Sequence, residues 1–233
     1  MKKFLVLAAL LTISTAPAFA GAITEWTFET TSAGIAGTSN HIDNIAAEVG
    51  TGIASGVHAG AGTVWSSPAG NFSSHSFSST LWAVGDYYQF QTSTIGFSGI
   101  AVVWDQTGSS TGPRDFALSY SLDGNTYTTV SPGYSVLQNG LAPNPSWGAA
   151  TGSSAYTLGY DLSAITTLDN ASSVFFRLTD TDTTSVSGGT VGTGGTDRID
   201  NFTVQTAPVP EPSAAALGIL GGLAGLVVWK RRK

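Results

Sequence analysis

The sequence predicts an all-β fold, an antiparallel β-sandwich, for the central part of the chain, and three observations support this prediction. Glycine is abundant, with 29 of 233 residues, whereas charged residues make up only 10% of the sequence. Short segments of alternating apolar and polar residues recur between glycine-rich stretches, which is typical of sandwiches. Asp123-Gly124 separates two such segments and predicts a tight hairpin, because glycine accepts the positive φ of these turns.

The N-terminal segment predicts export. Two lysines at residues 2–3 precede an apolar stretch, residues 4–13, and small residues occupy Ala18 and Ala20. This order is typical of a secretory signal peptide, with cleavage after Ala20. The apolar stretch is too short to span a membrane. We therefore expect the general secretion machinery to export the chain and signal peptidase to remove residues 1–20.

The predicted strands follow one another along the ectodomain, residues 21–207. Both faces of 99–105 are apolar, which indicates a buried central strand. Strict alternation over 116–122 places the apolar side chains of this strand on one face. The first strand is expected at residues 23–28, where the alternation slips between Ile23 and Trp26 and predicts a bulge or a later strand start. The other strands are expected at residues 81–84, 87–91, 99–105, 116–122, 127–130, 156–162, 174–178 and 198–204.

The remaining ectodomain segments are predicted to be loops. Residues 30–63 are rich in small residues, and a short helix or irregular run is expected around 42–49. Residues 131–154 contain three prolines and several glycines, and residues 180–197 are rich in threonine and glycine.

The charge of the ectodomain is strongly asymmetric. Residues 21–207 contain three arginines, fourteen acidic residues and no lysine, so their formal charge is −11. Such a surface repels nucleic acid, which excludes a nucleic-acid partner, and it suits divalent cations. The chain has no cysteine, so disulfides do not stabilise it. We expect its stability to come from an ordinary hydrophobic core, with a bound metal ion as a further contribution.

The C-terminal segment contains three ordered elements. Pro210-Glu211-Pro212 precedes an uncharged run, residues 213–229, and four basic residues, 230–233, end the chain. A helix over the run is about 25 Å long, slightly less than the roughly 30 Å hydrocarbon core. Basic side chains and Trp229 extend its reach into the interfaces. We predict a transmembrane helix over 213–229 with a cytoplasmic basic tail.

This C-terminal order resembles the PEP-CTERM sorting signal, with Val209, Pro210, Glu211 and Pro212 as the sorting motif over residues 208–233. The resemblance implies an exosortase partner, an intramembrane cysteine transpeptidase of Gram-negative bacteria that make extracellular polysaccharide. The enzyme is expected to cut near the motif and transfer the new terminus to another anchor, at the cell surface or in the extracellular matrix. The alternative is a permanent tail anchor in which Pro-Glu-Pro is only a linker.

The ectodomain also carries a resemblance. Residues 110–116, 120–124 and 198–201 occur in an order similar to ectodomains common among PEP-CTERM proteins, which look like jelly-rolls related to carbohydrate-binding modules. The resemblance implies surface or matrix association. We therefore expect a structural or adhesive role in an exopolysaccharide matrix, as in a biofilm. The alternatives are a glycan-binding module and an enzyme that acts on polysaccharide.

The sequence assigns no catalytic residue, and we do not expect an enzyme. Residues 108–112 match G-x-S-x-G, but a proline and a strand follow, and no histidine lies C-terminal to Ser110. A surface loop is the better interpretation. The histidines, His41, His58 and His75, lack the spacing of a zinc site and are expected in solvated loops.

Calcium is the one cofactor that the sequence suggests. Asp180 and Asp182 lead into a glycine-rich loop that Asp197 and Asp200 close, and oxygen ligands of this kind suit calcium. No EF-hand spacing is present. The alternative is that Arg198 pairs with these acids.

Exposed aromatic rings would offer a platform for sugars. Trp147 lies in a loop rich in proline and glycine and is the main candidate for glycan binding, although tryptophan is more often found in cores. Further candidates lie near predicted loops and strand ends: Trp65, Trp82, Tyr134 and Tyr160.

Overall fold

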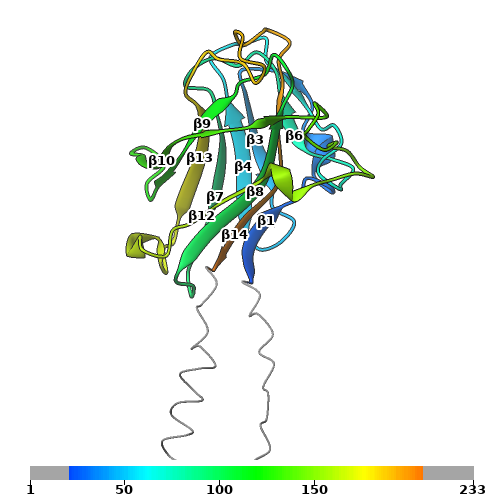
Figure 1. Cartoon of the computed structure of the whole chain (residues 1–233). Helices are drawn as coiled ribbons and strands as arrows, with labels where there is room; N and C mark the ends of the chain where they lie inside the picture. Colours follow the sequence, from blue (N-terminus) through cyan, green and yellow to red (C-terminus); the bar gives the residue numbers. More distant parts are fainter. Residues whose placement is uncertain (1–20, 207–233) are drawn as a thin grey trace, which may run out of the picture. The chain divides into compact units, whose positions relative to one another are not determined.

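The computed structural model describes residues 21–206 (Figure 1). The signal-peptide cleavage residues Ala18 and Ala20, the sorting motif and the predicted transmembrane helix 213–229 lie outside these residues. Among residues 21–206, no helix is long and apolar enough to cross a membrane. The helical segments of this part are three short 3-10 turns, η1 (Ser32–Gly34), η2 (Ser154–Tyr156) and η3 (Thr166–Leu168).

Eight strands form the first sheet, in the order β11-β8-β14-β6-β5-β2, with β1 also paired to β14 and β12 to β8. The pairs are antiparallel except for β11 and β8, which run parallel. The strands are β1 (Ala22–Trp26), β2 (Gly37–Thr38), β5 (Val64–Ser66), β6 (Phe77–Ser79), β8 (Ile100–Gly108), β11 (Leu137–Gln138), β12 (Thr157–Asp161) and β14 (Asp197–Thr206).

Six strands form the second sheet, in the order β10-β9-β13-β7-β4-β3, and all pairs are antiparallel. The strands are β3 (His41–Ala46), β4 (Gly52–Val57), β7 (Tyr87–Thr92), β9 (Asp115–Ser121), β10 (Thr128–Ser135) and β13 (Val174–Asp180).

Aromatic side chains from both sheets form a shared core. The rings of Phe90 in β7 and Phe202 in β14 stack with centroids 3.6 Å apart, and Trp26 in β1 packs edge-on against both. All three side chains are fully buried. Two sheets packed face to face around one core form a β-sandwich, so the predicted fold class is confirmed at this level. The jelly-roll connectivity inferred from the resemblance stays a prediction.

Several predicted elements are present. The apolar segment 99–105 becomes β8, which lies between β14 and its neighbours β11 and β12 and is buried along most of its length. The Asp-Gly hairpin pairs β9 with β10. An irregularity is present in β1, but it is a register shift between Ala22 and Thr24, earlier than expected, and the strand begins at Ala22.

Some predicted elements are wrong. The predicted loop 30–63 contains β2, β3 and β4, and the predicted loop 131–154 contains the end of β10 and all of β11. The segment expected to be a short helix or irregular run, 42–49, contains strand β3. The segment 81–84 is not a strand, because Leu81 has a left-handed backbone with φ of 56° and the chain turns there. The indole of Trp82 donates a hydrogen bond back to the Ser79 carbonyl at 3.1 Å, which closes the turn.

Candidate functional site

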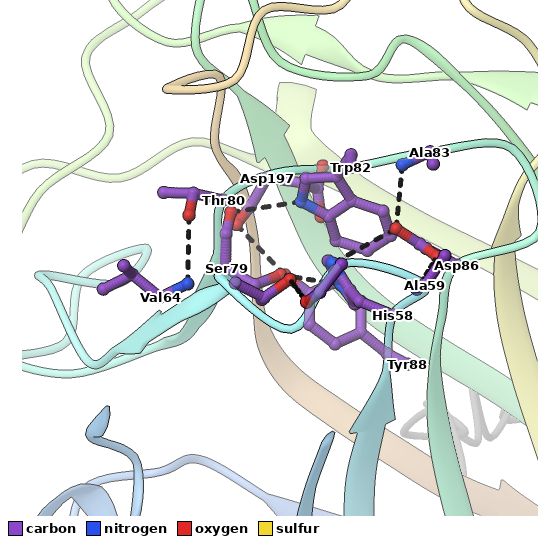
Figure 2. Close-up of polar contacts among 12 residues, drawn as sticks. His58, Ala59, Val64, Ser79, Thr80, Trp82, Ala83, Asp86, Tyr88 and Asp197 are labelled. Atoms are coloured by element: carbon purple, nitrogen blue, oxygen red, sulfur yellow. Dashed lines mark hydrogen bonds and ion pairs between the residues drawn. The ribbon is translucent and has the colours of Figure 1, made fainter. Parts of the chain in front are cut away.

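A buried polar cluster surrounds His58, which directly follows β4 (Figure 2). His58 Nδ1 lies 3.2 Å from Asp86 Oδ2, and His58 Nε2 lies 3.3 Å from the Ser79 hydroxyl. The imidazole sits between Trp65 and Trp82, at centroid distances of 4.8 and 4.3 Å. Only 2% of His58 is exposed, so the prediction of a solvated loop histidine is wrong at this position. His41, by contrast, is exposed.

Asp86 organises this cluster. Its carboxylate accepts hydrogen bonds from the Ala59 and Ala83 N–H groups at 2.7 and 2.8 Å, so it links the end of β4 to the turn before β7. Burial lowers the pKa of His58, against the opposing effect of the Asp86 charge. Burial therefore favours the neutral imidazole, which suits an aromatic environment.

The order Ser79–His58–Asp86 matches the nucleophile, base and orienting acid of hydrolases. However, Ser79 is fully buried, and its hydroxyl also contacts the Tyr88 hydroxyl at 3.1 Å. Tyr88 in turn donates to the Asp197 carbonyl at 3.1 Å. A substrate carbonyl has no access to the Ser79 hydroxyl in this arrangement. The cluster therefore joins the two sheets and is not an active site.

Asp200, one of the predicted calcium ligands, is occupied by hydrogen bonds. Its Oδ2 accepts from the Asn71 N–H at 2.8 Å and the Ser73 hydroxyl at 2.6 Å, and its Oδ1 accepts from the Asn201 N–H at 2.8 Å. Burial raises the pKa of Asp200 to about 7, and these hydrogen bonds oppose that shift. Asp200 therefore fixes the loop that precedes β6.

Asp180 and Asp197 are also buried. Asp180 Oδ2 has no hydrogen-bond partner among the described residues, and burial raises the pKa of this carboxyl to about 7. Burial likewise raises the pKa of Asp197, whose Oδ1 accepts from the Gln106 amide at 3.1 Å. Within residues 21–206, no three histidine or acidic side chains are grouped to hold a metal ion. Asp182 is exposed and accepts two hydrogen bonds from Thr184.

Trp147, the predicted sugar platform, is buried. Only 5% of it is exposed, its indole donates to the Ala69 carbonyl at 2.8 Å, and Tyr156 packs edge-on against it. The prediction of an exposed ring is therefore wrong, because Trp147 anchors its own loop. Trp65 and Trp82 are also buried in the core.

The three arginines of the ectodomain have different environments. Arg114 forms an ion pair with Asp115 at 2.7 Å. The guanidinium of Arg177 stacks between the rings of Tyr87 and Tyr127, at 3.9 and 3.7 Å, and donates to Gln89 at 2.8 Å. Arg198 forms no ion pair with any described residue, so the alternative in which it pairs with the loop acids is wrong.

A polar pocket of about 250 Å³ adjoins Arg198. It lies where β8, β11 and β14 meet and includes serines of the 108–112 loop. Sequence reasoning missed this pocket, because its residues come from three distant segments. Its lining residues are Thr107, Gly108, Ser109, Ser110, Gln138, Asn139, Thr196 and Arg198.

Comparison with solved structures gives distant likenesses. The CBM22-1–CBM22-2 tandem domain of Paenibacillus barcinonensis Xyn10C is 14% identical, with 87% of this chain and 49% of that chain covered and a TM-score of 0.41. The K3 cleaved adhesin domain of Lys-gingipain from Porphyromonas gingivalis is 16% identical, with 80% and 100% covered and a TM-score of 0.40. These scores are too low to support an inference about function. No curated protein matches the chain.

Comparison with protein families gives a direct match at the C-terminal end. Residues 208–233 match the PEP-CTERM protein-sorting motif, which includes the Pro-Glu-Pro sequence and the uncharged run. The chain therefore combines an all-β domain of two packed sheets with a C-terminal PEP-CTERM sorting motif.

Proposed function

We propose that this chain is an exported protein that an exosortase of a Gram-negative bacterium sorts to the cell surface or extracellular matrix. In this proposal residues 1–20 are the signal peptide, 21–207 the ectodomain and 208–233 the sorting signal. The ectodomain has a structural or adhesive role in an exopolysaccharide matrix and is not an enzyme. The PEP-CTERM motif is the observation that carries the proposal, because it implies exosortase processing.

The composition of the ectodomain supports this role. A formal charge of −11 over residues 21–207 makes copies of the ectodomain repel one another, which keeps an exported domain soluble. The nucleophile-like serine of the domain, Ser79, is sealed in the core. We therefore infer that the ectodomain is a stably folded domain whose role depends on where the sorting signal delivers it.

Intact-mass analysis of the protein from surface material tests the sorting proposal. The expected product lacks residues 1–20 and the segment that follows the Pro-Glu-Pro sequence. Glu211→Ala should cause the full tail to be retained in the membrane fraction. Asp43→Ala, which removes one exposed carboxylate of the ectodomain, should be processed normally. Surface protein that keeps residues 213–233 would contradict sorting and support the permanent anchor.

A second candidate function is glycan binding, and the polar pocket at Arg198 favours it. Titration of the full-length chain with oligosaccharides tests this candidate. Binding that saturates at one site per chain would support it, and the absence of any binding would leave the structural role.

A further inference from the structure

The pocket at Arg198 lies on the outer face of the eight-stranded sheet. Along β14, Ile199 points into the core, so its neighbour Arg198 points outward. Arg198 pairs in register with Thr107 of β8, and Gln138 of β11 pairs with Gly108. The parallel β11–β8 pair therefore places an amide side chain and a guanidinium at the same end of the sheet.

One group of lining residues fixes the shape of the pocket. The Thr107 hydroxyl donates to the Leu137 carbonyl at 2.8 Å, and the Ser109 hydroxyl accepts from the Thr196 N–H at 2.8 Å. Asn139 Oδ1 accepts from the Trp147 N–H at 2.8 Å. These bonds join β11, the 108–112 loop and the 139–147 loop, so the walls are held before any ligand arrives.

A second group of lining residues has unused hydrogen-bonding capacity. Among the described residues, the Arg198 guanidinium, the Gln138 amide, and the hydroxyls of Ser110 and Thr196 form no side-chain hydrogen bond, although all four line the pocket. Together they offer the five N–H donors of one guanidinium, one side-chain amide and two hydroxyls. This set is suited to a ligand that carries both a negative charge and hydroxyl groups.

Arg198 differs from the other two arginines of the ectodomain in having no neutralising or stacking partner. Arg114 has Asp115, and Arg177 has two tyrosine rings. Burial lowers the pKa of Arg198, although the buried Asp197 carboxyl opposes this shift. A half-buried cation without a direct partner is costly to keep, and a bound anion would remove that cost.

We propose that this pocket binds a carboxylated sugar, such as a uronate unit of an acidic polysaccharide. Arg198 receives the carboxylate, because its planar fork matches the two carboxylate oxygens. Gln138, Ser110 and Thr196 receive the sugar hydroxyls. The volume lies just below the roughly 300–1,000 Å³ of drug-sized ligands, which fits a single sugar ring. This inference rests on the proposed matrix role in one respect, which is that the matrix polysaccharide supplies the ligand.

The long-range charge of the domain does not prevent this binding. The ectodomain carries −11 overall, but at physiological ionic strength charges beyond about 8 Å are largely screened. The local cation and the hydrogen-bonding groups therefore decide whether an acidic sugar is held. Tighter binding of an acidic sugar than of a neutral sugar is therefore informative. The net negative charge of this domain repels an acidic sugar, so nonspecific electrostatics would produce the opposite order of affinities.

Calorimetric titration of the full-length chain in detergent tests the inference. The probes are oligogalacturonate, a neutral galacto-oligosaccharide of the same length, and inorganic sulfate. Oligogalacturonate should bind at one site, and Arg198→Gln should weaken it about tenfold or more, as expected for a charged hydrogen-bonded pair. Gln138→Ala, which removes a side chain without an internal partner, should weaken binding by a smaller factor.

Arg177→Gln is the matched control, because it removes the same charge from the outer face of the other sheet. It should leave the affinity for oligogalacturonate unchanged. Absence of oligogalacturonate binding, or an equal loss in both arginine variants, would overturn the inference. Equal affinity for sulfate or for the neutral oligosaccharide would overturn the assignment of a carboxylated sugar. Sorting to the surface is measured separately, by the intact-mass analysis described above. The sorting proposal and the sugar-binding proposal are therefore able to fail independently.

Discussion

The His58 cluster and the Arg198 pocket both gather polar side chains in a domain whose core is mainly aromatic, but their hydrogen bonds are completed differently. In the cluster, Asp86 accepts two backbone N–H groups and faces His58, and the Ser79 hydroxyl contacts Tyr88 (Figure 2). In the pocket, Arg198 and Gln138 have no side-chain partner among the described residues.

This difference shows how burial separates a structural polar cluster from a binding site. An unpaired polar group costs about 1–3 kcal/mol when it is buried. Accordingly, Asp86, Ser79 and Tyr88 are hydrogen-bonded within the protein, and His58 Nδ1 faces the Asp86 carboxylate at 3.2 Å. Groups at the pocket are partly exposed and meet water when no ligand is present. A Ser–His–Asp order is therefore structural in this chain, whereas a glycine- and serine-rich loop contributes to the candidate site.

The largest expected effect comes from Asp86→Ala. This change removes the carboxylate that faces His58 in the core and the acceptor of the Ala59 and Ala83 N–H groups. Because each of the two lost hydrogen bonds to the charged carboxylate is worth about 1.5–3 kcal/mol, the free energy of unfolding should fall by about 3–5 kcal/mol. Urea unfolding followed by tryptophan fluorescence measures the loss, and Asp86→Asn, which keeps one acceptor oxygen, should lose less. A loss below about 1 kcal/mol would show that the cluster does not hold the sheets together.

The second effect is a pH dependence from Asp180. Burial raises the pKa of its carboxyl from 3.8 to about 7, so the folded state binds the proton more tightly than the unfolded state does. The stabilisation from this proton is complete below pH 3.8 and is lost as the pH rises through 7. Asp180→Asn removes the titration, so the variant should become more stable than the original chain by about 2–4 kcal/mol as the pH rises from 5 to 8.

The difference between the two stability profiles isolates Asp180 together with its effect on the pKa of Asp197, because the remaining titrations are common to both chains. Burial lowers the pKa of His58 below 6.5, so its contribution has the opposite sign and is lost as the pH falls through that region. Urea unfolding at pH 5, 6, 7 and 8 gives the difference. Parallel profiles for the two proteins would show that Asp180 stays ionised throughout.

Replacing Arg177 and replacing Arg198, neither of which pairs with a carboxylate, should have different and smaller effects on the free energy of unfolding. Arg177→Ala removes a guanidinium that two tyrosine rings enclose and should cost about 1–2 kcal/mol. Arg198→Ala removes no internal contact of this kind and should change the free energy of unfolding by less than about 0.5 kcal/mol. Equal losses in urea unfolding would mean that Arg198 is a structural residue, which would weaken the case for a ligand at that position.

The longest and most regular strands were predictable from the sequence, and the short strands were not. Strand β8 shows as an apolar run and β9–β10 as alternation around Asp-Gly. Strand β4 was missed because it is built from small residues. Its glycines have a physical cause, since a Cβ at Gly52 would lie 2.6 Å from the Trp26 ring and one at Gly56 would lie 2.3 Å from the Trp65 ring.

The candidate sites were less predictable, because their residues meet only through the sheet topology. His58 and Asp86 are 28 positions apart, and no local period relates them. Arg198 was placed correctly in the last strand, but the pocket beside it also takes residues from β8 and β11, which the sequence does not place next to β14. Trp147 illustrates the converse error, since a proline- and glycine-rich loop suggests exposure and this loop instead folds over its own tryptophan.

The smallest expected effect is that of calcium on the melting temperature, which should not change. Calcium takes six to eight oxygen ligands. Asp200 is already bonded through both oxygens, and Asp182 Oδ1 accepts two bonds from Thr184. Of the four predicted acids, Asp180 and Asp197 each have one buried oxygen, Oδ2, without a hydrogen-bond partner among the described residues. Thermal melts with chelator and with millimolar calcium measure the shift. A rise that Asp180→Asn abolishes would show instead that a cation neutralises Asp180, and the pH dependence above should then disappear in calcium.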